Sequence, residues 1–108
     1  YKLGSVGMIM LFANWDPAYA LEMHEVALSG DIERAQEMWW KARDLLNFMY
    51  AGGGTRLASL GKEMVRIVGL SMGSYERLPM RRPSEETRLK LSKLMKKAGM
   101  AYRPEGAG

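Results

Sequence analysis

Residues 4–17, "GSVGMIMLFANWDP", decide the fold that this sequence predicts. Val6–Phe12 places apolar side chains on both faces of an extended chain, which is typical of a buried strand in a parallel sheet. Asp16 followed by Pro17 is a typical helix start, because Asp caps free N–H groups and Pro lacks the N–H that the first turn leaves unused. We therefore predict a strand that runs into a helix. One strand cannot satisfy its own backbone hydrogen bonds, so we expect its partners to lie outside these 108 residues.

Composition limits the class of protein. With 108 residues, of which 47% are hydrophobic and 26% charged, the chain predicts one globular domain. No apolar run approaches the roughly 20 residues of a membrane span, and no signal peptide is recognisable. The absence of cysteine excludes disulfides and thiolate chemistry and fits a cytoplasmic protein. Because the sequence begins at Tyr1 in the middle of a pattern, we expect a fragment or a processed chain.

Apolar residues at helical spacing predict four helices. They cover Pro17–Ser29, the residues between Asp31 and Gly52, Thr55–Val68, and the residues between Ser84 and Gly99. Gly30, Gly69 and Gly99 are expected to end helices, and Gly61 to mark close packing. The residues between Gly69 and Ser84 are expected to be irregular, and the tail after Tyr102 to fray. The predicted inward stripes comprise Tyr19, Met23, Val26, Ala35, Met38, Trp39, Ala42, Leu45, Leu46, Met49, Leu57, Leu60, Met64, Ile67, Leu91, Leu94, Met95 and Ala98.

Residues with catalytic potential are few, and each has a simpler structural interpretation. His24 is the only histidine, and one His among scattered carboxylates is a poor metal site. Three glycines at 52–54 lack the preceding strand and the Lys-Ser/Thr of a phosphate loop, so they predict a connector. Nothing around Lys62 indicates the desolvation that a Schiff-base lysine needs. We expect no catalytic residue, metal site or cofactor site in this chain.

The tryptophans and the basic residues are candidates for contacts with other macromolecules. Trp39 is expected to face the core, and Trp40 to lie at its rim and contact another subunit. A free-standing basic module that binds nucleic acid or a protein partner is the alternative function. We favour a solvated helix face instead, because no aromatic residues alternate with the cations. The basic cluster comprises Arg81, Arg82, Arg88, Lys90, Lys93, Lys96, Lys97 and Arg103.

Five segments in order carry a family resemblance: "LGSVGMIMLFANWDP", "SGDIERAQEM", "GKEMVRIVGL", "ERLPMRRPSEE" and "KKAGM". From about Leu3 to Met100, the chain resembles the C-terminal portion of the dihydrodipicolinate synthase / N-acetylneuraminate lyase family. That resemblance implies an α/β fold, a (β/α)8 TIM barrel with C-terminal helices. It makes residues 1–29 the last strand and helix of the barrel and residues 30–108 a three-helix extension.

The resemblance also implies a function. Members of this family are class I lyases, in which a sixth-strand lysine forms a Schiff base with pyruvate or a related 2-keto acid and a fourth-strand tyrosine relays protons. Both positions lie upstream of this chain, and Lys62 matches a lysine of the helical extension. The implied partners are the remainder of the barrel, the 2-keto acid and further subunits of a homotetramer.

The same resemblance places part of the substrate pocket in this chain. Barrel active sites lie at the carboxyl ends of the strands. The expected pocket wall is therefore Met10, Phe12, Ala13 and Asn14. Met10 stands where the family often has serine or glycine, and residues 56–61 lack the usual Asn-Pro-x-Pro connector. These departures favour a lyase, hydratase-aldolase or dehydratase over dihydrodipicolinate synthesis itself.

Overall fold

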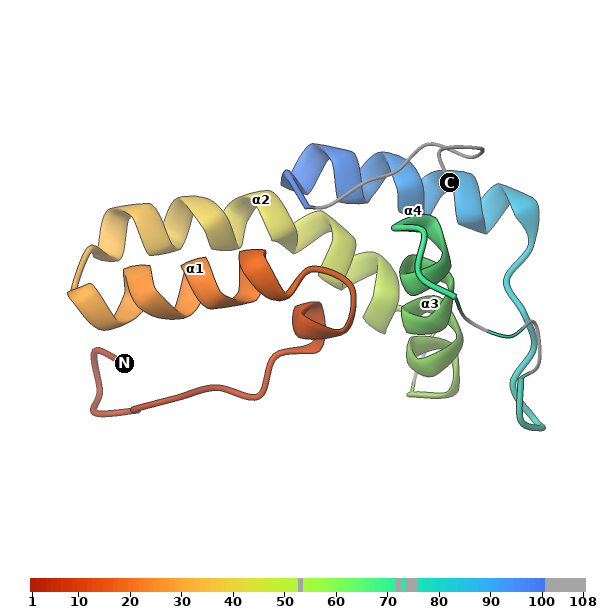
Figure 1. Ribbon diagram of the computed structural model, residues 1–108, viewed down its shortest axis with the longest axis horizontal. Helices are drawn as coiled ribbons and strands as arrows, with labels where there is room; N and C mark the ends of the chain where they lie inside the picture. Colours follow the sequence, from red (N-terminus) through yellow and green to blue (C-terminus); the bar gives the residue numbers. More distant parts are fainter. Residues whose placement is uncertain (53, 72, 74–75, 101–108) are drawn as a thin grey trace.

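In the part of the chain that the structure describes, the chain forms four α-helices and one short 3-10 helix (Figure 1). The computed structural model describes residues 1–52, 54–71, 73 and 76–100, with only the backbone of residues 54 and 55. The 3-10 helix η1 spans Leu11–Asn14. The α-helices are α1 (Pro17–Ser29), α2 (Ile32–Tyr50), α3 (Gly54–Ile67) and α4 (Glu85–Ala98). The four predicted helices are thus confirmed: α1 and α4 have the predicted bounds, and the ends of α2 and α3 differ from the prediction by at most one residue.

Local chemistry fixes the helix ends. The Asp16 carboxylate accepts a hydrogen bond from the Tyr19 N–H at 2.9 Å, directly before Pro17. Gly30 ends α1 with φ of +86°, a left-handed conformation that a side chain would strain. Ser84 begins α4 in the same manner as Asp16 begins α1, and Gly99 ends it with φ of +75°. The predicted caps are confirmed.

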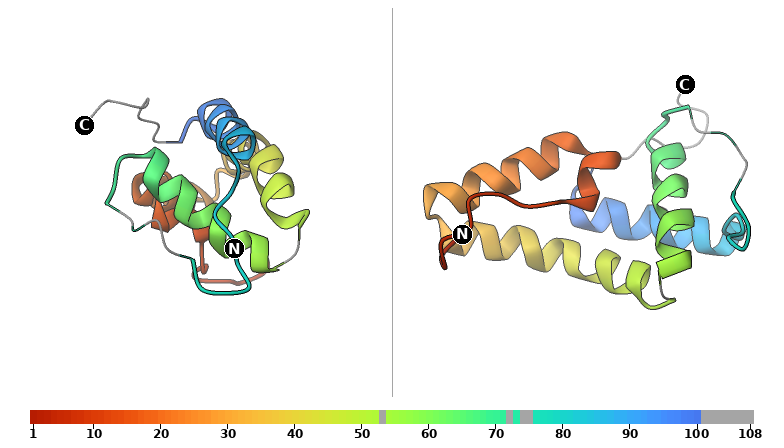
Figure 2. Two further views of the ribbon diagram at one scale, coloured as in Figure 1. Left: turned by 90° about the vertical axis from the view of Figure 1, so that its right-hand side faces the viewer. Right: turned by 90° about the horizontal axis from the view of Figure 1, so that it is seen from below.

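Helix α2 organises the packing, because each of the other three α-helices contacts it. Helices α1 and α2 form an antiparallel hairpin, α4 lies along the C-terminal half of α2, and α3 crosses this end of the molecule (Figures 1 and 2). The buried apolar side chains of all these elements meet in one core: Phe12, Trp15, Tyr19, Met23, Met38, Ala42, Leu45, Met49, Leu60, Met64, Val65, Ile67, Val68, Leu91, Met95, Ala98 and Met100.

The N-terminal segment differs from its prediction. In the described residues there is no strand: residues 5–10 lack regular structure, and Leu11 and Phe12 belong to η1. Val6 is 86% exposed and Ile9 fully exposed. The expected strand over Val6–Phe12 is therefore not formed. A strand requires a neighbour to accept and donate its backbone hydrogen bonds, and no other described segment of this chain is extended beside it.

Two predictions about α2 and α3 are wrong. Trp39 does not face the core but is 47% exposed, because the buried stripe of α2 consists of Met38, Ala42, Leu45 and Met49. Gly61 does not mark close packing, since a methyl group built at this position would meet no atom within 4 Å. Trp40 is exposed, as expected.

The remaining segments agree where the structure describes them. Gly69 has φ of +86° at the end of α3, and the described residues between it and Ser84 contain no helix or strand. The predicted fraying after Tyr102 lies outside the described residues. Among the described helices, none combines the length and the apolar character of a membrane-spanning segment.

Candidate functional site

The four residues expected to line a substrate pocket lie at the start of the folded region, in different surroundings. Phe12 is 3% exposed and packs edge-on against Trp15 and Tyr19, with ring centroids 5.9 and 5.8 Å apart. Met10 is partly buried, whereas Ala13 and Asn14 are exposed. The Asn14 side-chain amide donates a hydrogen bond to the Leu11 carbonyl at 3.0 Å. Three of the four side chains thus retain access to solvent, and Phe12 belongs to the core.

Asn14 borders a hollow of about 360 Å³ between η1 and α3, which we call the η1–α3 hollow. Most of its walls are apolar. Among the described residues of its lining, only Lys62 is formally charged. The Lys62 side chain is 32% exposed, and its ammonium lies 3.1 Å from a carboxylate oxygen of Glu76. The lining residues are Leu11, Asn14, Leu57, Ala58, Gly61, Lys62 and Val65.

Behind Lys62 lies a cluster of buried ion pairs. The Glu63 side chain is 1% exposed, and its carboxylate lies 2.8 Å from Arg66 and 3.1 Å from Arg88. Arg82 approaches the same carboxylate at 3.4 Å. Glu76, 3% exposed, accepts from Arg66 at 3.2 Å. These contacts join α3, the irregular segment after it and α4 into one electrostatic unit.

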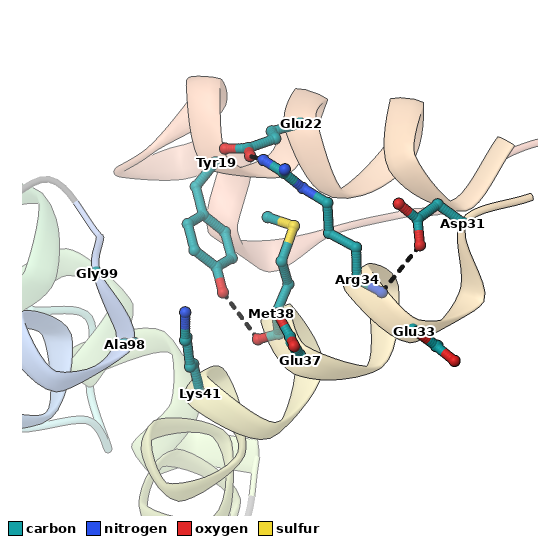
Figure 3. Close-up of a pocket in the computed structure, with 10 residues that line it drawn as sticks. All are labelled: Tyr19, Glu22, Asp31, Glu33, Arg34, Glu37, Met38, Lys41, Ala98 and Gly99. Carbon is teal, nitrogen blue, oxygen red and sulfur yellow. Dashed lines mark hydrogen bonds and ion pairs between the residues drawn. The ribbon is translucent and has the colours of Figure 1, made fainter. Parts of the chain in front are cut away.

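A second, polar hollow of about 550 Å³ lies between α1, α2 and the end of α4 (Figure 3). Tyr19 points from α1 toward α2 and donates its hydroxyl to the Met38 carbonyl at 2.9 Å. Arg34 reaches back from α2 to Glu22, with 2.6 Å between guanidinium and carboxylate. The described residues that line it are Tyr19, Glu22, Asp31, Glu33, Arg34, Glu37, Met38, Lys41, Ala98 and Gly99.

The environment changes proton affinities in this second hollow. Burial raises the pKa of the Tyr19 hydroxyl, and the nearby carboxylates of Glu22 and Asp16 raise it further. The hydrogen bond to Glu22 raises the pKa of the exposed Arg34 guanidinium. The hollow therefore keeps Tyr19 protonated, as a hydrogen-bond donor rather than as a base. In the described part of the chain, no group of three or more His, Asp or Glu side chains is arranged to hold a metal ion.

Comparison with known proteins decides the family. The sequence pattern of the dihydrodipicolinate synthetase family matches residues 1–98. The chain belongs to this family. It is 33% identical over 104 residues to the 4-hydroxy-tetrahydrodipicolinate synthase of Methanopyrus kandleri, a match that covers 96% of the chain and 33% of the synthase. No solved structure matches the chain significantly.

Further relatives of the dihydrodipicolinate synthetase family agree. The chain is 32% identical over 94 residues to the synthase of the same name from Methanospirillum hungatei, covering 87% of the chain and 31% of the relative. It is 28% identical over 99 residues to an uncharacterised DapA-like lyase of Thermofilum pendens, covering 91% of the chain and 32% of that protein. The chain thus spans about a third of the length of the curated relatives that it matches.

The other residues considered from the sequence have structural partners. His24 contacts the Tyr1 hydroxyl through its ring nitrogen. Of the basic cluster, Arg82 and Arg88 pair with Glu63, and Lys97 pairs with Asp44 at 2.6 Å. Lys90 lies over the Phe48 ring, 4.7 Å from its centroid. Arg103 lies outside the described residues. Internal carboxylates thus compensate three of these cations, and nothing in their arrangement favours the nucleic-acid alternative over family membership.

Sequence reasoning missed the buried ion pairs and the η1–α3 hollow. A signal for the first was present: Glu63 stands three residues after Leu60 and four before Ile67, so it lies on the apolar stripe of α3. A carboxylate on such a stripe must find cations when the helix packs. No local signal marks the hollow, because it forms only where η1 and α3 meet.

Proposed function

We propose that this chain is the C-terminal part of a Schiff-base-forming lyase that acts on pyruvate or a related 2-keto acid. The observation that carries the proposal is the family match over residues 1–98 together with coverage of only about a third of each curated relative. The catalytic lysine and tyrosine would then belong to the preceding two thirds of the polypeptide. The reaction itself would be an aldolase, hydratase-aldolase or dehydratase reaction.

The exposed N-terminal segment supports the proposal that this chain is one part of a longer polypeptide. Val6 and Ile9 project into solvent from an irregular stretch, and a free apolar segment of this kind is a liability in an isolated protein. Pairing with neighbouring strands would bury both faces and satisfy the backbone. We propose that Val6–Phe12 becomes the last strand of a (β/α)8 barrel in the longer polypeptide. Residues 1–29 would then complete the barrel, and residues 30–108 would form its helical extension.

In that arrangement Met10, Phe12, Ala13 and Asn14 would lie at or near the carboxyl end of the last strand, where barrel enzymes hold their substrates. They would shape the pocket wall without taking part in proton transfer or covalent chemistry. Strand pairing would release Leu11 and Phe12 from η1, since a residue cannot be both in a 3-10 turn and in a ladder. The helical extension would provide packing and subunit contacts in a homotetramer.

The decisive experiment measures the mass of the whole polypeptide and tests whether it forms a Schiff base with pyruvate. The polypeptide that carries this chain is purified from its source, its intact mass is measured, and it is treated with borohydride in the presence of pyruvate. We expect a mass about three times that of the chain, following the coverage of the relatives. We also expect an irreversible pyruvate adduct, because borohydride reduces the imine between lysine and the keto carbon to a stable amine.

Lactate, which has no keto group, is the control ligand and should give no adduct. Gel filtration with light scattering on the same sample tests the tetramer. A stable polypeptide of the size of this chain alone, or a larger one without a pyruvate-dependent adduct, would overturn the proposal.

A further inference from the structure

The aromatic ring of Phe48 contacts two cations from different helices. The Arg56 guanidinium of α3 lies over this ring, 4.6 Å from its centroid, and the Lys90 ammonium of α4 lies over the same ring at 4.7 Å. Phe48 belongs to α2, and these three helices all contact one another. We call Phe48, Arg56 and Lys90 the Phe48 cluster. The tertiary structure thus gathers two positive charges at one aromatic ring.

Both charges lack a carboxylate partner among the described residues. In that part of the chain, neither Arg56 nor Lys90 forms an ion pair or donates a side-chain hydrogen bond. Glu86 stands one turn before Lys90 on α4 but does not pair with it. Asp44, one turn before Phe48 on α2, is engaged in another ion pair at 2.6 Å. The N–H donors of both cations therefore remain available to a ligand.

Gly52 positions the Arg56 side chain. A methyl group built on Gly52 would lie 2.1 Å from Cδ of Arg56 and 3.1 Å from its Cβ and Cγ, closer than carbon atoms pack. The aliphatic part of Arg56 thus crosses the glycine backbone where a larger residue would obstruct it. Arg56 and Phe48 are both partly buried. The guanidinium is therefore held over the ring before any ligand arrives, which lowers the ordering cost of binding.

The geometry of the Phe48 cluster suits a phosphate group. Each cation lies within 4.7 Å of the ring centre, so the two charges are at most twice this distance apart. A phosphate group presents oxygens in several directions, so it can accept hydrogen bonds of about 2.7–2.9 Å from both cations at once. Arginine suits phosphate in particular, because its N–H groups form a planar fork. The positive edge of the aromatic ring also attracts an anion.

We infer that the Phe48 cluster binds the phosphate group of a small phosphorylated ligand, with Arg56 and Lys90 as the donors. The site lies on α2, α3 and α4 and contains none of the residues of the expected pocket wall. The inference therefore goes beyond the proposed function and does not depend on it. Binding involves no covalent step.

The test is calorimetric titration of the whole polypeptide that carries this chain with inorganic phosphate, methyl phosphate and methanesulfonate. Constant ionic strength keeps screening equal for the three probes. We expect the two phosphates to bind with similar affinity. Methanesulfonate should bind at least about tenfold more weakly, because its single charge forms weaker bonds with the two cations. No binding of either phosphate, or equal affinity for all three probes, would overturn the inference.

Variants of the two cations locate the site. Arg56→Gln and Lys90→Gln should each lower the affinity for methyl phosphate by about tenfold, since each removes one charge-assisted contact. Lys96→Gln, which removes an exposed α4 lysine outside the Phe48 cluster, is the matched charge control and should bind as the parent does. If Arg56→Gln and Lys90→Gln bind no more weakly than Lys96→Gln, the phosphate lies elsewhere and the inference is wrong.

Gly52→Ala separates the position of the guanidinium from its charge. The φ angle of Gly52 is not positive, so alanine is compatible with the backbone, whereas its methyl group displaces the Arg56 side chain. We expect the affinity for methyl phosphate to fall in Gly52→Ala, with no further fall when Gly52→Ala is added to Arg56→Gln. Circular dichroism checks that the helices are intact. An equal loss with and without Arg56 would overturn the assignment.

The two proposals are tested by separate readouts. Pyruvate trapping requires the catalytic lysine in the preceding part of the polypeptide, whereas phosphate binding requires Arg56 and Lys90. Either proposal can therefore fail while the other stands.

Discussion

At the scale of single residues, Tyr19 illustrates how burial converts a titratable group into a structural one. Its hydroxyl is donated to the Met38 carbonyl at 2.9 Å, which links α1 to α2 beneath the polar hollow. Burial, followed by the charges of Glu22 and Asp16, raises its pKa. The folded state therefore prefers the protonated form more strongly than the unfolded chain does.

This preference predicts an alkaline loss of stability. Because the folded pKa lies above the ordinary value of 10.0, the contribution of Tyr19 is complete below pH 10 and is lost as the pH rises through the raised folded value. Urea denaturation at intervals from about pH 9 to about pH 11 should show a steeper fall for the parent chain than for Tyr19→Phe. At neutral pH the variant should be less stable by about 1 kcal/mol, the worth of one hydrogen bond. Parallel pH profiles would contradict this assignment.

At the scale of elements, the ion pairs of Glu63 and Glu76 explain how an irregular segment is fixed between two helices. Arg66 of α3 donates to the Gly73 carbonyl as well as to Glu76, so the segment after α3 is attached through both backbone and side chain. Glu63 joins the same arginine to Arg88 of α4. Helices α3 and α4 are thus held together by ion pairs as well as by packing of their apolar stripes.

Glu63→Gln tests this connection while preserving size and shape. Removing the charge leaves Arg66 and Arg88 facing a neutral amide where each had a buried carboxylate within 3.1 Å, so the free energy of unfolding should fall by about 3–5 kcal/mol in urea denaturation. The matched control is Glu22→Gln, which breaks the exposed pair with Arg34 and should cost no more than about 1 kcal/mol. If both variants cost the same, the buried cluster contributes no more than a surface ion pair.

At the scale of the whole molecule, the helices form a closed core, whereas Val6 and Ile9 of the N-terminal segment lie outside it and are exposed. Val6 and Ile9 give this segment an apolar surface at the side of a molecule about 40 Å long. The physical expectation for such a surface is association with other polypeptide, whether the remainder of a barrel or a second copy of the chain.

We therefore predict that the isolated chain self-associates as its concentration rises and that Val6→Asp combined with Ile9→Asp suppresses this association. Both side chains are more than four-fifths exposed, so the double variant should retain the helical content and unfolding midpoint of the parent. Sedimentation velocity over a concentration series provides the measurement. Leu89→Asp, at a half-exposed position on α4, is the control and should not change association. A parent chain that stays monomeric throughout would contradict the prediction.

Local sequence was sufficient for the helices and their ends. A cap such as Asp16 or Ser84 acts on an N–H only three residues away, and Gly30 is selected by the sign of one φ angle. These interactions need no tertiary neighbour, which is why they could be predicted. The family could likewise be recognised, since ordered segments of sequence carry it.

The tertiary structure decided which apolar residues are buried and which polar ones meet. Trp39 and Met38 are adjacent in sequence, yet only Met38 is buried in the core, because the elements packed against α2 cover one stripe of it. Glu63 meets Arg82 and Arg88 only after the chain has turned back from α3 to α4. The strand predicted over Val6–Phe12 failed for the same physical reason. A helix satisfies its hydrogen bonds within itself, whereas a strand and a buried charge depend on partners that only the assembled molecule supplies.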